Sequence, residues 1–263
     1  MGKVDFKKEF KDLYGPSPRA PVIVNVPAMN FLMVDGRGNP NTSQEYREAI
    51  EVLYPMSYTL KFAAKQGELQ RDYTVMPLEG LWWAEDMNAF TEDRKDEWLW
   101  TAMIMQPGFI SADMVEDARE TVRRKKNPVA LEKLRFETFD EGPSGQIMYV
   151  GPYSDEGPTI QALHEFIERL GFELAGKHHE IYLSDPRRTA PEKLRTIIRP
   201  PCRSRAQSIR RQIRDQGAIS AGPERFGASI VIEMSCRGLN PLRENLKIPS
   251  LLMRGGAVWQ LVG

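Results

Sequence analysis

The sequence predicts an α+β protein made of two β-α-β-β units in tandem, with pseudo-twofold symmetry and a central cleft. Three observations support this. The order of strand-like and helix-like segments in residues 20–106 recurs in residues 133–200, and a helical stretch at 111–126 connects the two copies. Apolar residues make up 41% of the chain and charged residues 27%, as in ordinary globular domains. One helix on a small sheet is too little to be stable alone, so the copies should pair.

The first copy should contain one helix among four strand-like runs. The helix should begin at Thr42, because Glu45 follows at the spacing of a capping box. Pro55 should kink it, since proline lacks the N–H that an inner turn needs. Gly80 is compatible with a regular strand or with a bulge. The strand-like runs are 22–26, 31–34, 73–83 and 98–105.

The second copy repeats this order. Its helix carries apolar side chains at helical spacing from Ile160 to Leu170, and Gly171 stands where helices commonly end. Thr189 and Glu192 again have capping-box spacing. The strand-like runs of this copy are 134–139, 146–150, 179–183 and 194–198.

The zero net charge of the chain combines two unlike segments. Residues 1–198 hold 25 basic and 32 acidic side chains, whereas residues 199–263 hold 11 and 4. The acidic body argues against nucleic acid as a partner. We therefore expect a domain at 1–200 and an irregular, Arg-rich extension at 201–263, in which only residues 228–234 could form a strand. A read-through or a shifted frame after about residue 200 is the alternative origin of this tail.

Several classes of protein are disfavoured by what the sequence lacks. No apolar stretch approaches the ~20 residues that span a bilayer, and the N-terminus has no signal-peptide core, so we expect a cytoplasmic protein without membrane contact. No nucleophile, phosphate-loop or zinc motif is present, which predicts a cofactor-free protein without a metal. His178 and His179 are adjacent on a strand and should point to opposite faces. The sequence makes no prediction of the oligomeric state.

Aromatic side chains gather around two isolated acids, Glu79 and Glu180. A carboxylate on an aromatic wall is partly desolvated, which raises its pKa and suits it to general-base catalysis or to pairing with a cation. We therefore take both acids as candidate catalytic residues. The alternatives are core packing for the aromatic rings and solvent-facing strand positions for the acids. The candidate ligand-binding residues are Trp82, Trp83, Trp100, Tyr58, Tyr149, Tyr153 and Tyr182.

Several short motifs resemble those of the GyrI-like small-molecule-binding proteins. The most specific is HEIYLSDPRR at 179–188, and the others are YTVMPLEGLWW at 73–83, IMQPGF at 104–109, YVGPY at 149–153 and TAPEKL at 189–194. The resemblance covers about residues 5–200 and is strongest to the stand-alone bacterial branch. It implies the tandem β-α-β-β fold with a central ligand cleft, and it places the acid of that cleft at Glu180. The tail departs from the family pattern.

We consider three candidate functions, of which the resemblance implies the first. In the first, a cofactor-free hydrolase opens the cyclopropane of flat, electrophilic cyclopropanoid genotoxins, with Glu180 or Glu79 activating a water, and so detoxifies them. In the second, a non-catalytic protein binds and sequesters hydrophobic or cationic drugs. In the third, the protein shields a target such as gyrase. The expected ligand of the first two is a flat aromatic or hydrophobic small molecule.

Overall fold

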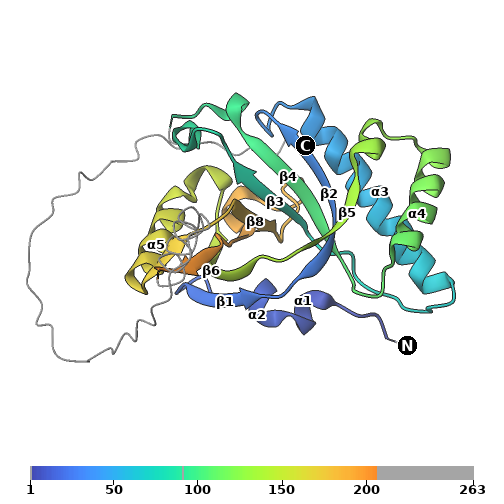
Figure 1. Ribbon diagram of the computed structural model, residues 1–263, viewed down its shortest axis with the longest axis horizontal. Helices are drawn as coiled ribbons and strands as arrows, with labels where there is room; N and C mark the ends of the chain where they lie inside the picture. Colours follow the sequence, from blue (N-terminus) through green and yellow to red (C-terminus); the bar gives the residue numbers. More distant parts are fainter. Residues whose placement is uncertain (1, 91, 206–263) are drawn as a thin grey trace, which may run out of the picture. The chain divides into compact units, whose positions relative to one another are not determined.

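The computed structural model describes residues 2–90 and 92–205 (Figure 1). Eight strands form one antiparallel sheet in the order β1-β6-β9-β8-β3-β4-β2-β5, and β7 pairs separately with β10. The sheet is curled into a half-barrel that forms a cleft. The strands are β1 Val22–Val26, β2 Met29–Arg37, β3 Leu78–Trp83, β4 Leu99–Gln106, β5 Arg135–Phe139, β6 Gly142–Val150, β7 Phe172–Leu174, β8 His178–Tyr182, β9 Arg195–Ile198 and β10 Cys202–Ser204.

The strand order contains the predicted repeat and confirms the α+β fold class. The first copy contributes β3, β4 and β2 as neighbours, and the second contributes β8, β9 and β6 in the mirrored order. The copies join where β3 pairs with β8 at the centre of the sheet. The leading strands are exchanged, because β1 pairs with β6 of the second copy and β5 pairs with β2 of the first. Each copy therefore completes the sheet of the other.

The longer helices are α3 Gln44–Gln66, α4 Ala112–Lys125 and α5 Gly157–Arg169, and two short helices, α1 Phe6–Glu9 and α2 Lys11–Tyr14, precede β1. Figure 1 shows α4 on the outside of α3, and α5 at the other end of the sheet. Gly145 lets α5 approach closely, because a Cβ there would lie 2.5 Å from Cδ1 of Ile167. No helix in the described part of the chain is long and apolar enough to cross a membrane.

Both α3 and α5 cover the same face of the sheet, which we call the helical face. Residues opposite each other on neighbouring strands share a face, and this relation runs from Ile147 through Ile198 to Glu180. Ile147 and Ile198 pack in one cluster with side chains of α5, and Tyr46 of α3 packs on Trp100. The other face carries the contacts of α2, and we call it the N-terminal face.

Both predicted capping boxes are wrong in detail. The side chain of Ser43, and not that of Thr42, caps α3 by accepting the N–H of Tyr46 at 3.3 Å. Glu45 instead accepts the N–H of Arg37 at 3.2 Å, which ties the helix to the end of β2. The turn at Pro191–Lys193 follows Ala190 and has no side-chain cap, so Thr189 does not cap it.

The predicted strand at 73–83 is too long. Only Leu78–Trp83 joins the sheet, because Pro77 has no N–H to extend the ladder, and Tyr73 forms an isolated bridge with Val4. Gly80 is not a bulge, since β3 pairs without interruption with β4 on one side and with β8 on the other.

The described fold continues past residue 200. Cys202–Ser204 form β10, which pairs with β7, and both Arg199 and Cys202 are buried. These residues belong to the fold because they form the strand that pairs with β7, which the sequence analysis missed. The predicted strand at 228–234 and the rest of the extension lie outside the described residues.

Candidate functional site

Glu79 and Glu180 lie on opposite faces of the sheet. Glu180 stands opposite Gly80, whereas Glu79 stands opposite Ile181, so the two acids differ by one residue in register. A shift of one residue moves a side chain to the other face. The structure therefore divides the predicted residues between two buried clusters, and does not bring the two acids together.

Glu180 is the centre of a polar cluster on the helical face. The hydroxyl of Tyr182 donates to its Oε2 at 2.7 Å, and Nε2 of His178 lies 3.0 Å from its Oε1. The indole N–H of Trp82 donates to the same tyrosine oxygen at 3.1 Å. Glu180 is only 1% exposed, so these contacts replace water around its carboxyl group.

Glu156, a residue that sequence reasoning missed, faces Glu180. It is 1% exposed, and neither of its carboxyl oxygens accepts a hydrogen bond from a donor among the described residues. Burial and then the charge of Glu180 raise the pKa of Glu156 well above its usual range. Two carboxyl groups buried side by side resist ionising together, so this arrangement favours the protonated form of Glu156.

Glu156 has no strand alternation or motif that would have revealed it. It is the residue before the first turn of α5, and Pro158 stands in that turn. A carboxyl group at a helix N-terminus ordinarily accepts a backbone N–H, but no such bond is made by the side chain of Glu156. Glu156 could be recognised as a site residue only from the structure, in which it lies beside Glu180.

Aromatic rings surround the two acids. Tyr153 meets Tyr182 edge to face at 5.7 Å between ring centroids, and Tyr46 of α3 lies 5.8 Å from Trp82. The hydroxyl of Tyr149 donates to the carbonyl of Pro152 at 3.0 Å, and burial and then the charges of Asp155 and Glu156 raise the pKa of Tyr149 to about 12. The helical face thus holds a carboxyl pair in an aromatic surround, the combination that suits a flat or cationic ligand.

The other predicted ligand-binding residues lie outside the hydrogen-bonded cluster of Glu180. Trp83 is on the N-terminal face, with Nζ of Lys177 3.2 Å from its ring centroid. Trp100 lies on the helical face opposite Trp82, fully buried against Tyr46, and its indole N–H has no hydrogen-bond partner among the described residues. Tyr58 is 47% exposed and lines a groove of about 850 Å³ between α3 and α4, to which neither acid contributes.

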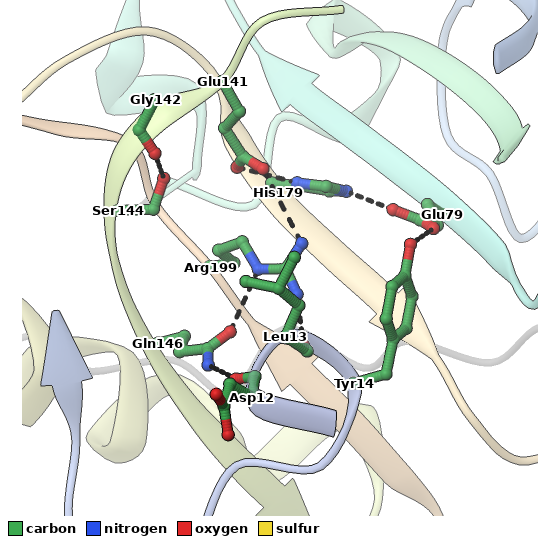
Figure 2. Close-up of polar contacts among 10 residues, drawn as sticks. All are labelled: Asp12, Leu13, Tyr14, Glu79, Glu141, Gly142, Ser144, Gln146, His179 and Arg199. Atoms are coloured by element: carbon green, nitrogen blue, oxygen red, sulfur yellow. Dashed lines mark hydrogen bonds and ion pairs between the residues drawn. The ribbon is translucent and has the colours of Figure 1, made fainter. Parts of the chain in front are cut away.

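Glu79 belongs to a second cluster, on the N-terminal face (Figure 2). The hydroxyl of Tyr14 donates to its Oε1 at 2.9 Å, and Nε2 of His179 lies 3.0 Å from its Oε2. Nδ1 of His179 meets Glu141 at 2.8 Å, and Arg199 lies beside Glu141. His178 and His179 therefore point to opposite faces, as predicted. The roles of Glu141 and Arg199 were not apparent from the sequence.

We expect Gly80→Ala to disturb the Glu180 cluster. A Cβ at this position would lie 2.7 Å from Nε1 of Trp82, so the indole would have to shift and lose its bond to Tyr182. Overpacking of this kind costs about 1–3 kcal/mol of stability. Urea unfolding and the fluorescence spectrum of the tryptophans would measure both effects. An unfolding free energy and a spectrum like those of the wild type would show that Trp82 is not held by this contact.

The chain matches the GyrI-like small molecule binding domain over residues 19–202. It is similar to three crystal structures from Listeria innocua. An uncharacterized conserved protein is 44% identical, covers 76% of this chain and 100% of its own, and has a TM-score of 0.71. Two structures described as hydrolases are 42% and 43% identical, cover 76% and 77% of this chain and 100% of their own, and have TM-scores of 0.67 and 0.70. No curated protein sequence matches the chain. Because this family match covers more than half of the chain and includes the fold described above, the protein belongs to the GyrI-like small-molecule-binding domain family.

Proposed function

We propose that the protein is a hydrolase that opens the strained ring of flat, electrophilic cyclopropanoid compounds, and so protects the cell from them. The observation that carries the proposal is the buried pair of carboxyl groups of Glu180 and Glu156, in which burial and the charge of Glu180 raise the pKa of Glu156. Such a pair supplies a base and an acid at the same pH without a cofactor. The similar Listeria proteins described as hydrolases support the reaction class.

In the proposed reaction, Glu180 takes a proton from a water while the water oxygen bonds to the CH₂ carbon of the ring. The ring C–C bond breaks, and its electron pair moves through the conjugated system to a carbonyl oxygen. Glu156 gives its proton to that oxygen. The product has gained one water, and a proton transfer from Glu180 to the neighbouring Glu156 restores the starting state.

The surrounding residues would position the reactants. Tyr182 donates to one carboxyl oxygen of Glu180, and Nε2 of His178 lies 3.0 Å from the other, so both contacts hold the orientation of the carboxyl group. Tyr153 lies against Tyr182 and is itself buried, so we propose that its ring moves to admit the substrate and then stacks on it.

The second candidate, sequestration of cationic drugs, is favoured by one observation. A single buried negative charge among aromatic rings also attracts hydrophobic cations. A cation would be retained unchanged, whereas a cyclopropanoid would leave as its hydrate. The two functions therefore differ in their product.

Mass spectrometry of a synthetic spirocyclopropyl dienone after incubation with the protein tests the proposal. We expect the mass of one water to be gained, and we expect Glu156→Gln to slow turnover ~10²-fold, because an amide cannot release the proton. The wild-type rate should also fall as pH rises and Glu156 loses its proton. An unchanged compound that nevertheless co-elutes with the protein would favour sequestration.

A further inference from the structure

A network of buried charges, drawn in Figure 2, lies on the N-terminal face and includes His179, the residue before Glu180 on β8. Its four members, Glu79, Glu141, His179 and Arg199, form what we call the His179 network. Each of these side chains is at most 1% exposed. Nη1 of Arg199 lies 3.7 Å from Oε2 of Glu141, and the other carboxyl oxygen of Glu141, Oε1, contacts the imidazole.

The geometry around His179 suits an imidazolium. Its Nδ1 lies 2.8 Å from a carboxyl oxygen of Glu141, and its Nε2 lies 3.0 Å from one of Glu79. A neutral imidazole has one N–H and can donate to only one of these oxygens, whereas an imidazolium donates to both. With His179 protonated, two positive and two negative charges cancel inside the fold.

The groups around His179 come from every element that packs against it. Glu79 lies on β3, Glu141 precedes β6, Arg199 follows β9, and the ring of Phe139 on β5 meets the imidazole edge to face. Burial alone would lower the pKa of His179, but the charges and hydrogen bonds of the two glutamates outweigh it and raise the pKa to about 9.

The same network holds the short helices before β1. Tyr14 of α2 donates its hydroxyl to Glu79, and Arg199 donates to the carbonyl oxygen of Leu13. Gln146 joins the two parts, because its amide donates to the carbonyl of Asp12 at 2.5 Å and accepts from Nε of Arg199 at 3.1 Å. The network therefore connects α2 to the centre of the sheet.

We propose that His179 is a positioning residue for the Glu180 site, an imidazolium that clamps β8 to its neighbours from the far face and holds α2 in place. The backbone supports this link, because the N–H of Arg199 donates to the carbonyl of His179 at 2.8 Å. Glu180 is the next residue on the same strand. The clamping is independent of the proposed function, and only its effect on catalysis rests on that function.

The clamp should depend on pH in a defined direction. The pKa of His179 is raised to about 9 from an ordinary value of 6.5. The stabilisation is therefore complete below about pH 6.5 and is lost as pH rises through about 9. One proton is involved, and with pKa values of about 9 in the folded state and 6.5 in the open state, the exchange protection of amides in α2 and β8, corrected for the intrinsic rate, should fall about 70-fold between pH 7 and pH 10.

Pulsed hydrogen exchange read by mass spectrometry tests the clamp with three variants. His179→Gln should reduce the protection of α2 and β8 at pH 7 and abolish its fall between pH 7 and pH 10. His178→Gln is the matched control, because it removes the neighbouring imidazole on the other face and should leave α2 as it is. Adding Glu141→Gln to His179→Gln rebalances the buried charge, and should restore most of the protection.

The outcomes separate the clamp from the enzyme. Wild-type protection that stays constant from pH 7 to pH 10 would overturn the clamp, and this measurement remains decisive if His179→Gln does not fold. The clamp would also be overturned if His178→Gln and His179→Gln lost the same amount of exchange protection in α2. If the wild type turns over the dienone, His179→Gln should lower kcat ~10-fold or more with KM little changed, since a misplaced base slows chemistry more than binding. A wild type that never turns over the dienone ends the proposed function while leaving the exchange result intact.

Discussion

Glu180→Gln should abolish most of the turnover of a cyclopropanoid while leaving its binding nearly unchanged. The amide keeps the shape of the side chain, and it can still accept from Tyr182, but it cannot take a proton from water. General-base catalysis contributes about 10²–10⁴-fold, so we expect kcat to fall by at least ~10²-fold. Stopped-flow or mass-spectrometric rates at saturating substrate would measure this, with affinity taken from tryptophan quenching.

A matched control for this substitution is Glu165→Gln, an exposed position on α5 that makes the same chemical change away from the site. It should have the turnover of the wild type. If Glu180→Gln turned over the substrate at the wild-type rate, Glu180 would not be the general base. If Glu180 is only a counter-charge, the variant should instead lose affinity for cations and keep it for neutral ligands.

Glu79→Ala should destabilise the fold more than any other single change proposed here. The substitution leaves His179 facing one carboxylate and removes the acceptor of the Tyr14 hydroxyl, in a site closed to water. Breaking a buried ion pair by removing one partner costs about 3–5 kcal/mol. Urea unfolding at pH 7 would measure the loss as a lower midpoint with an unchanged m-value.

The control for this loss is Glu137→Ala on the edge strand β5. That carboxylate also has a basic partner, since it lies 3.0 Å from Nε of Arg135, but its side chain is 53% exposed. Exposed pairs contribute about 0–1 kcal/mol, so the variant should unfold near the wild-type midpoint. Similar losses in the two variants would mean that burial of the Glu79 cluster adds nothing to stability.

Much of the architecture followed from local patterns in the sequence. The repeated order of segments predicted the two β-α-β-β units, because alternation and helical spacing reflect which side chains are buried. The connecting helix was predicted at 111–126 and is found at Ala112–Lys125, since Ser111 and the basic last turn are local signals. Gly171, predicted after the last helix, has a φ of +80°, which favours glycine.

The residue types of the candidate site, acids among aromatic rings on β3 and β8, could be predicted from the sequence. Their grouping could not, because it depends on how the strands and helices pack. Register put Glu79 and Glu180 on opposite faces, and a pairing shifted by one residue would have reversed this for either strand. Glu156 came to Glu180 through the docking of α5, a contact between segments that are distant in sequence. Local patterns record burial and spacing along one strand or helix, whereas a buried pair of charges depends on where two strands or helices meet in space, which only the packed sheet fixes.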